Sequence, residues 1–469
     1  GAFGSVYKAI HKSTNKTYAI KIIDYSKDNN KENNNIINFN YNSVQQETSI
    51  MRLVANSKYI VKYYGSYFSR KSNTLWLILE YCSSGSANDL MFSMNRTFSE
   101  VELATIMEMV LQGLALMHKK NLIHRDIKGA NILLSEDGYA KLGDFGVGAQ
   151  LSTEKYRMSK KGSPYWMSPQ IASNLKYDFK TDIWSLGITC IELLEGEPPF
   201  SQLKPSNVME KISKDPPDVS EMIDLNEHTL QFKSFIEHCL EVDPKKRYTA
   251  EELLQHEFIK KFSKGRKYMI SLIKKHENDV EKCMALLRRF HGIQLNVGHR
   301  FEIFDNIEYY EFLWKGQPSV HQEYGETKAN VLSLKSFIEE NAAEHCLTHI
   351  DAVPDNFLFY QESGEEKLQL TDWEYAGMQD PHVDIAMFCL YSLYDRPQID
   401  RIIDIYFEGK CDNRTRIKIY CYIAACGLLC SNWSEYKQTL GVEFGDYAEH
   451  QYRYAQTYYE IAREEIAGL

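Results

Sequence analysis

Residues 124–131 read HRDIKGAN. Within it Asp126 is followed five residues later by Asn131, and Asp144 comes after a short segment predicted to be a β-hairpin. An Asp that orients a hydroxyl group, followed by an Asn and a second Asp that hold Mg²⁺, is the arrangement that phosphoryl transfer from ATP requires. The stretch therefore predicts a phosphotransfer site with ATP and Mg²⁺ as cofactors.

A second stretch, residues 349–356, repeats this spacing. It reads HIDAVPDN, so that Asp351 is followed by Asn356, and Asp372 comes after another predicted hairpin. By the same logic Asp351 is a candidate catalytic base, and Asn356 and Asp372 are candidate Mg²⁺ ligands. The chain therefore contains one or two phosphotransfer sites, and the flanking motifs have to decide between these alternatives.

Bulk composition narrows the class of protein. The 469 residues suggest two or three domains, and the formal net charge of −10 argues against a nucleic acid or an anionic membrane as the main partner. The ten Cys contain no CxxC pair, so we expect a reducing compartment. The longest apolar run, residues 421–430, is too short to span a bilayer. We therefore expect a cytoplasmic protein without a membrane span.

Hydrophobic periodicity predicts a strand-rich N-terminal segment followed by a mostly helical one. The predicted strands lie at residues 4–23, 60–68 and 75–81, and the predicted helices at residues 44–54 and 101–118. Residues 26–42 are rich in Asn and Lys, and we expect a mobile insert there because such a tract buries little apolar surface. Helices and loops are expected to continue to about residue 262.

A domain boundary is predicted at residues 263–267, SKGRK, which are polar and contain the only Gly nearby. Residues 268–273 follow as a hinge-like strand. Further helices are predicted at residues 280–290, 331–343 and 414–436, and a strand–turn–strand pattern at residues 356–371. We therefore expect a linker at residues 263–267 and a second, mostly helical domain at residues 268–469.

Residues 1–262 resemble the eukaryotic protein kinases. The resemblance rests on motifs in a fixed order, which are GAFGSV at residues 1–6, AIK at 19–21, HRDIKGAN at 124–131 and DFG at 144–146. Other stretches are similar to the germinal-centre and Hippo-like branch of the sterile-twenty group, namely YIVKYYGSY at 59–67, GSPYWM at 162–167 and DIWSLGIT at 182–189.

This resemblance implies an α+β, bilobal protein kinase fold with Ser/Thr protein kinase activity. The N-lobe would cover residues 1–81 and the C-lobe residues 82–262. Because GAFGSV lacks the first Gly and the preceding strand of its motif, we expect the N-lobe to be slightly truncated. ATP would bind between the two lobes, and proteins would be the substrates.

The resemblance assigns catalytic roles to four residues. Asp126 accepts the hydroxyl proton and orients the attacking oxygen, and Lys128 neutralises charge on the transferring phosphoryl group. Lys21 contacts the α- and β-phosphates, and an ion pair with Glu47 holds it in place. A Lys two residues after the catalytic Asp is typical of Ser/Thr kinases, so we expect Ser and Thr hydroxyls as acceptors.

The resemblance also implies a nucleotide site. Asn131 and Asp144 bind Mg²⁺, and Leu79 controls access to the space behind adenine. The residues expected to contact ATP are Gly1, Gly4, Val6, Ala19, Lys21, Glu80, Cys82 and Leu133. Glycine at the first two of these positions lets backbone N–H groups come close to the phosphates.

Residues 144–170 correspond to the activation segment of these kinases. Ser159 lies where related kinases carry their activating phosphate, which would pair with Arg125 and order the segment. We expect this phosphate to come from an upstream kinase or from autophosphorylation in trans. Ser163, which precedes a Pro, is expected to contact the substrate and the catalytic loop.

The activation segment contains one departure from the family. Gln170 stands where these kinases have a Glu that pairs with an Arg matching Arg247. Gln170 can hydrogen-bond Arg247 but cannot neutralise its charge. We therefore expect the segment to be anchored more weakly, with the chemistry intact.

Residues 268–469 resemble the C-lobe of the bacterial choline kinase family, which is related to the aminoglycoside phosphotransferases. The resemblance rests on HIDAVPDN at residues 349–356, LTDWEYAG at 370–377 and DPHVDIA at 380–386. It implies a mostly helical kinase-like C-lobe and a choline-like ligand. The aromatic residues expected to surround a quaternary ammonium by cation–π contacts are Trp373, Tyr375, Tyr391, Tyr394 and Trp433.

The second region has no second Gly-rich loop or strand Lys before it, because its motifs begin directly after the first kinase-like region. Three functions therefore remain open: a protein kinase acting through Asp126, a choline or amino-alcohol kinase acting through Asp351, and a non-catalytic scaffold. The junction itself is either a natural fusion or the product of a faulty gene prediction.

Overall fold

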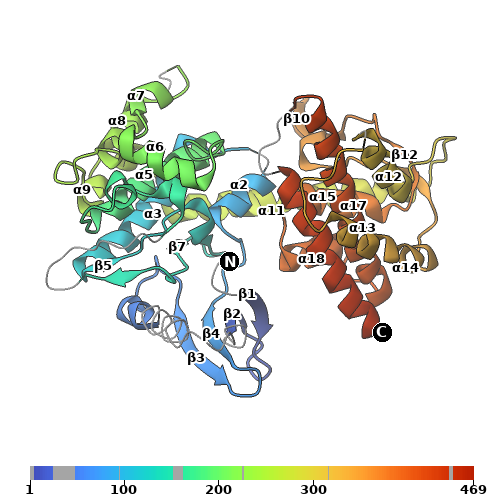
Figure 1. The fold of residues 1–469 in the computed structure, drawn as a ribbon, viewed down its shortest axis with the longest axis horizontal. Helices are drawn as coiled ribbons and strands as arrows, with labels where there is room; N and C mark the ends of the chain where they lie inside the picture. The colour runs from blue at the N-terminus through green and yellow to red at the C-terminus, as the bar shows by residue number, and fades with distance from the viewer. Residues whose placement is uncertain are drawn as a thin grey trace. The chain divides into compact units, whose positions relative to one another are not determined.

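The computed structural model describes residues 5–24, 48–94, 96–151, 162–223, 226–314, 316–442 and 447–469. The chain forms two compact units, Gly1–Lys275 and His276–Leu469. Both units combine short strands with helices, so the predicted α+β class is confirmed (Figure 1). The insert predicted at residues 26–42 lies outside the described residues.

The first unit begins with a four-stranded antiparallel sheet. Its strands are β1 (Ser5–Ile10), β2 (Thr17–Asp24), β3 (Tyr63–Ser69) and β4 (Thr74–Glu80). They lie in the order β1-β2-β4-β3, and residues 48–54 form a helix (Figure 1). Lys21 on β2 pairs with Val6 on β1 and with Leu77 on β4. Pairing on both sides therefore holds the backbone of Lys21 inside the sheet.

The rest of the first unit is mostly helical, as predicted. Its helices are α2 (Ala87–Ser93), α3 (Glu100–Lys119), α4 (Pro169–Ala172), α5 (Lys180–Glu195), α6 (Pro205–Lys214), α7 (Val219–Met222), α8 (Leu230–Cys239), α9 (Ala250–Leu254) and α10 (Glu257–Phe262), with a 3₁₀ turn η3 (Pro164–Trp166). The core lies between α3 and α5, where Leu103, Leu114 and Trp184 are fully buried.

Helix α3 begins at a capping box, in which Ser99 and Glu102 each accept a hydrogen bond from the backbone N–H of the other. Among the described helices, α3 has the length and apolar composition to cross a membrane, but 67% of its apolar window is buried inside the protein. Its apolar side chains are therefore accounted for by the core of the first unit.

Two short antiparallel strand pairs flank residues 124–131. Strand β5 (Leu122–Ile123) pairs with β8 (Ala149–Gln150), and β6 (Ile132–Leu134) pairs with β7 (Ala140–Leu142) after the 3₁₀ turn η2 (Gly129–Asn131). Residues 124–131 therefore run from the end of β5 to the start of β6, and Asp144 follows β7. The hairpin predicted between Asn131 and Asp144 is confirmed.

The strand predicted at residues 268–273 is wrong. These residues belong to a 28-residue helix, α11 (Gly265–Gly292), which also includes the last three residues of the predicted linker. Its apolar residues recur at helical spacing, so that Met269 and Ile273 contribute to the core of the first unit. Met284 and Leu287, further along the same helix, contribute to the core of the second unit. A short apolar run does not by itself distinguish a strand from one turn of a longer helix.

The second unit is mostly helical, as predicted. After α11 its helices are α12 (Ile303–Leu313), α13 (Tyr324–Ser333), α14 (Lys335–Glu340), α15 (His382–Tyr391), α16 (Arg396–Tyr406), α17 (Asn413–Thr439) and α18 (Tyr447–Ala467). Its strands form two pairs, β9 (Cys346–Thr348) with β12 (Gly377–Gln379) and β10 (Phe357–Glu362) with β11 (Glu365–Leu370), and η4 (Pro354–Asn356) precedes β10. The second pair confirms the predicted strand–turn–strand pattern.

Candidate active site

The catalytic loop of the first unit is held by a buried carboxylate. Asp182, in the first turn of α5, accepts hydrogen bonds from the backbone N–H groups of His124 (3.0 Å) and Arg125 (2.8 Å). His118 Nε2, at the end of α3, donates to the same carboxylate at 2.9 Å. These bonds let Arg125 adopt a left-handed conformation, with φ of 69°, which turns the chain toward Asp126.

Burial and hydrogen bonding act in opposite directions on Asp182. The side chain is completely buried, and burial by itself raises the pKa of a carboxyl group. The hydrogen bonds from His118 and from the backbone favour the ionised form and outweigh burial, so that the pKa of Asp182 lies below its usual value. Asp182 is therefore a charged residue inside the core that orders residues 124 and 125.

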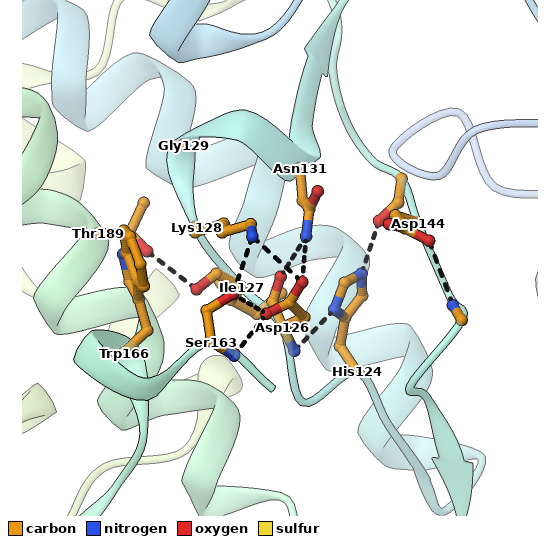
Figure 2. Close-up of polar contacts among 12 residues, drawn as sticks. His124, Asp126, Ile127, Lys128, Gly129, Asn131, Asp144, Ser163, Trp166 and Thr189 are labelled. Atoms are coloured by element: carbon orange, nitrogen blue, oxygen red, sulfur yellow. Dashed lines mark hydrogen bonds and ion pairs between the residues drawn. The ribbon is translucent and has the colours of Figure 1, made fainter. Parts of the chain in front are cut away.

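Asp126 is the centre of a polar cluster (Figure 2). Asn131 Nδ2 donates to the backbone oxygen and to Oδ2 of Asp126, both at 2.8 Å. The backbone N–H and Oγ of Ser163 donate to Asp126 Oδ1 at 2.9 and 2.7 Å. Lys128 Nζ donates to Ser163 Oγ at 2.8 Å and lies 3.5 Å from Asp126 Oδ2. The structure thus brings together the residues predicted for the catalytic loop, and it confirms the predicted contact of Ser163 with this loop.

Lys21 and Asp144 meet as an ion pair. Lys21 Nζ lies 2.9 Å from Asp144 Oδ1, and the Lys21 side chain is largely buried. Burial by itself raises the pKa of Asp144, but the charge of Lys21 and its hydrogen bond outweigh burial, and the pKa is lowered. Glu47, the predicted partner of Lys21, lies outside the described residues. Lys21 is therefore held by the carboxylate that was predicted to bind the metal.

The residues present fit a Mg²⁺-nucleotide. Asn131 uses its Nδ2 atom on Asp126, so that the amide presents its oxygen as the remaining polar atom. Asp144 supplies carboxylate oxygens beside the positive charge of Lys21. Mg²⁺ prefers such oxygen ligands and commonly binds through one or two side chains together with substrate phosphates.

The predicted adenine-contacting residues line up along the sheet and the β6–β7 hairpin. Glu80 directs its carboxylate to the backbone N–H of Lys62 (3.1 Å) and to Lys141 Nζ (3.1 Å), and its own backbone N–H donates to the backbone oxygen of Lys62 (2.8 Å). Burial raises the pKa of Cys82 to about 12, which keeps its thiol protonated. Leu133 lies partly buried on β6.

Two of the predicted nucleotide-contacting residues, Val6 and Ala19, lie on the first two strands. Val6 is an exposed residue on β1, and Ala19 is partly buried on β2. Gly1, Gly4 and Ser159 lie outside the described residues. The nucleotide contacts of all the predicted residues and the phosphorylation of Ser159 stay predictions.

Gln170 contacts Arg247, as predicted. Arg247 donates to Gln170 Oε1 at 3.0 Å, and Gln170 Nε2 donates to the backbone oxygen of Val242 at 2.7 Å. Arg247 is 1% exposed, and burial lowers its pKa to about 10. The guanidinium is therefore hydrogen-bonded to a neutral amide at a place where a carboxylate could also neutralise it.

We expect Gln170→Glu to stabilise the first unit by about 1 kcal/mol, because a charge-assisted hydrogen bond replaces a neutral one. The gain is reduced by loss of the amide that donates to Val242. The measurement is the thermal midpoint, which should rise by roughly 2–4 °C. Gln255→Glu, at the end of α9, is the matched control and should leave the midpoint unchanged. A thermal midpoint that falls in Gln170→Glu would show that other groups already balance the positive charge of Arg247.

The catalytic loop of the second unit repeats the hydrogen bonds of the first. The backbone N–H groups of His349 and Ile350 donate to Asp384 at 3.0 and 2.7 Å. Asn356 Nδ2 donates to the backbone oxygen and to Oδ2 of Asp351 at 2.8 and 3.1 Å. The two loops therefore share one backbone arrangement, although their surrounding sequences differ.

The residues that surround the two loops also correspond between the first and second units. His291, in the last turn of α11, lies 2.8 Å from the Asp384 carboxylate, as His118 on α3 lies near Asp182. Asp372 has a positive φ of 60°, like Asp144 with 52°. Sequence reasoning assigned no role to the two buried carboxylates. Their signal is an Asp in the first turn of an apolar helix that follows the catalytic motifs.

A cavity of about 200 Å³ lies beside Asp351. Its lining residues are Phe301, Tyr310, Ile350, Asp351, Glu374, Tyr375, Met387, Tyr391, Leu429, Cys430 and Trp433. Burial raises the pKa of Asp351, and hydrogen bonding from Asn356 only partly opposes this effect. The cavity thus combines aromatic faces with two carboxyl groups.

Of the five aromatic residues predicted to surround a quaternary ammonium, Tyr375, Tyr391 and Trp433 line this cavity and the other two do not, while contact with such a ligand stays a prediction. Trp373 packs against His349, with ring centroids 4.6 Å apart, and it does not line the cavity. Tyr394 is 5% exposed in the core of the second unit. Residue type alone does not show whether an aromatic side chain faces the cavity or packs elsewhere in the unit. The other lining residues, which include Phe301, Tyr310 and Glu374, were not predicted.

Comparison with known proteins finds a family match for each of the two regions. The model of the protein kinase domain matches residues 1–259, which is more than half of the chain. The chain belongs to the protein kinase family. Within this kinase, the model of the phosphotransferase enzyme family matches residues 274–420. The predicted relationships of residues 1–262 and of residues 268–469 are confirmed.

Two curated relatives are similar to the kinase domain. The Ser/Thr-protein kinase hippo of Drosophila melanogaster is 42% identical over 261 residues, which cover 55% of this chain and 36% of that protein. The Ser/Thr-protein kinase pakH of Dictyostelium discoideum is 41% identical over 260 residues, which cover 55% of this chain and 48% of that protein. The kinase therefore spans between about a third and a half of the length of these relatives.

Proposed function

We propose that this kinase transfers the γ-phosphoryl group of ATP to Ser and Thr hydroxyls of protein substrates. The observation that supports this most directly is the cluster around Asp126, in which Asn131, Ser163 and Lys128 hold one carboxylate from three sides. Kinase-type catalysis depends mainly on positioning and on charge stabilisation, and this cluster supplies both. The similarity to two Ser/Thr kinases supports the choice of acceptor.

Each residue of the cluster has a separate role in this proposal. Asp126 Oδ accepts the proton of the acceptor hydroxyl, and Lys128 Nζ places positive charge within 3.5 Å of that carboxylate. Mg-ATP, when bound, supplies the phosphoryl group and neutralises its charge through the metal. Lys21 and Asp144 form an ion pair near this cluster. Asn131 donates to Asp126, and its backbone oxygen accepts a hydrogen bond from the backbone N–H of Gly143, the residue before Asp144. A phosphate on Ser159, added by an upstream kinase or in trans, is proposed as the activating modification.

The test is a phosphotransfer assay with the full chain, Mg-ATP and a generic basic protein as acceptor. Hydrolysis of the product should release phosphoserine and phosphothreonine, and omission of Mg²⁺ should abolish transfer. Recovery of phosphotyrosine alone would contradict the proposed acceptor. Absence of any transfer from a chain that is folded would contradict the proposed activity.

The cavity beside Asp351 favours a second function, which is phosphorylation or binding of a small amino alcohol such as choline. Aromatic faces attract a quaternary ammonium, and the Asp351 and Glu374 carboxyl groups complement its charge. A cavity of about 200 Å³ suits a small ligand rather than a peptide side chain with its backbone. Asp351 lies at the position where it can receive the proton of the ligand hydroxyl.

Choline-dependent release of ADP by the full chain is the expected result of this second function. Asp351→Ala should abolish this release, and Asp126→Asn should leave it unchanged, because the two residues belong to separate units. Choline binding is measured separately by the fluorescence of Trp433, with Trp433→Phe as the control. Fluorescence that responds to choline without ADP release would assign binding alone to this cavity. No response at any choline concentration would contradict both.

A further inference from the structure

Residues 260–273 lie between the two family matches, which end at residue 259 and begin again at residue 274. In the structure they are not an extended connection, because residues 265–273 form the first part of α11. Met269, Leu272 and Ile273 are 0%, 8% and 4% exposed, and they belong to the core of the first unit. A segment outside both family matches is therefore packed as part of the kinase fold.

The start of this segment is anchored to α3. Ser263 Oγ donates to Glu108 Oε2 at 2.5 Å, and the backbone N–H of Lys264 donates to Thr105 Oγ1 at 3.0 Å. Both acceptors lie on α3, the helix whose last turn carries His118. These bonds fix the point at which α11 begins.

The helix then passes across the turn of the β6–β7 hairpin at very close range. A Cβ atom on Gly138 would lie 2.6 Å from Ile270 Cγ1 and 2.7 Å from the backbone oxygen of Arg266. Gly138 also has a positive φ of 81°, which favours glycine. The contact between hairpin and helix is therefore so close that only a glycine fits between them.

Arg266 makes the second contact with this hairpin. Its guanidinium donates to the backbone oxygen of Asp137 at 3.2 Å and lies 5.2 Å from the ring centroid of Tyr139. The Tyr139 ring packs edge to face against Tyr59, 6.0 Å away. The backbone oxygen of Tyr59 accepts a hydrogen bond from Leu142 N at 2.9 Å, at the end of β7. Arg266 thus supports β7 from the turn, and Tyr59 supports it from the other end.

This hairpin carries the metal-binding candidates of the kinase site. Asn131 immediately precedes β6, and Asp144 follows β7 by two residues. The strands pair over three residues each, and Gly143 N donates to the backbone oxygen of Asn131 at 2.9 Å. Because the hairpin is so short, a displacement of its turn reaches both ends.

We propose that Arg266 and Ile270 are positioning residues of the kinase site, which hold the turn at residues 135–139 and thereby set the distance between Asn131 and Asp144. The inference rests on the proposed protein kinase function. It assigns a role in phosphoryl transfer to a helix that the kinase family match does not include. The first half of α11 acts here through the hairpin and touches neither substrate nor nucleotide.

The test compares Arg266→Ala and Ile270→Ala with Lys267→Ala, an exposed neighbour on the same helix. All are made in the full chain, and kcat and KM for ATP are measured well below the thermal midpoint. We expect kcat/KM for ATP to fall by about tenfold in the first two variants, because misplaced ligands lower the rate without unfolding. Arg266→Lys keeps the charge over Tyr139 and should restore part of the loss. A residue with only a packing role would lower the midpoint and leave kcat/KM per folded molecule unchanged.

Hydrogen exchange of the amides at residues 135–142 gives a readout that does not depend on activity. Arg266→Ala and Ile270→Ala should speed exchange at these amides, and Lys267→Ala should not. If the unmodified chain transfers no phosphate but exchange responds as expected, the positioning contact stands and the proposed kinase function falls. If exchange and kcat/KM both stay unchanged in Arg266→Ala and Ile270→Ala, the inference is overturned.

Discussion

Asp126→Asn should reduce kcat for protein phosphorylation by about 10³-fold, because an amide cannot accept the proton of the acceptor hydroxyl. The substitution keeps size and shape, and the oxygen of the substituted amide can still accept the hydrogen bonds that Ser163 gives to Asp126 Oδ1, so that the side-chain bond lost is the one from Asn131 Nδ2 to Oδ2. The thermal midpoint should therefore stay within about 2 °C of the unmodified chain. The measurement is the rate of phosphate transfer from Mg-ATP to a generic basic protein at saturating ATP.

The chain supplies its own matched control for this prediction. Asp351 occupies the same position in the second catalytic loop, with the same bonds from its Asn partner. Asp351→Asn should leave protein phosphorylation unchanged. Equal transfer by Asp126→Asn and by the unmodified chain would refute the role of Asp126. Loss of transfer in both variants would show that the two catalytic loops contribute to one activity.

Asp182→Ala should destabilise the first unit by about 3–5 kcal/mol, because it removes the partner of buried groups. The backbone N–H groups of His124 and Arg125 would lose their acceptor, and so would His118. The same loss would release the turn that presents Asp126. We therefore expect both a lower thermal midpoint, by roughly 10 °C, and a loss of phosphotransfer. The local measurement is hydrogen exchange at residues 122–127, which should become faster.

Asp384→Ala is the counterpart in the second unit and should speed exchange at residues 346–351 instead. Asp182→Asn keeps one acceptor oxygen and should be intermediate. Since the pKa of Asp182 is lowered in the folded state, its contribution to stability is present above about pH 4 and is lost as the pH falls through the folded pKa. Asp182→Ala should therefore flatten the acid side of the stability profile. An unchanged profile and unchanged exchange would contradict the supporting role of Asp182.

Much of the candidate site was predictable, because its spacing is local. Asp126 and Asn131 are five residues apart on one loop, and the hairpin that follows returns the chain to Asp144. Ser163 was also placed correctly by its motif. The pairing of Lys21 with Asp144 was not predicted, because these residues are 123 positions apart and their contact depends on how β2 approaches the end of β7.

The roles of the two buried carboxylates, Asp182 and Asp384, were not predictable from the sequence. Asp182 and Asp384 look like ordinary helix-initiating residues, since an Asp in the first turn of a helix is common and usually solvated. Each acts instead on a loop that precedes it by 34 to 58 residues. Only the packed helices bring these carboxylates to the backbone N–H groups of the catalytic loops.

Side chains at short, fixed spacings in the sequence were enough to predict the kinase family and the two loops around Asp126 and Asp351. The tertiary structure showed which residues support those loops. It also showed that residues 265–267 of the predicted linker belong to α11. Residues 268–273 carry a pattern compatible with a strand or a helix, and burial of Met269 and Ile273 against the first core selects the helix. The physical reason is that burial and close approach, as between Gly138 and Ile270, depend on residues far apart in the chain and have no local signature.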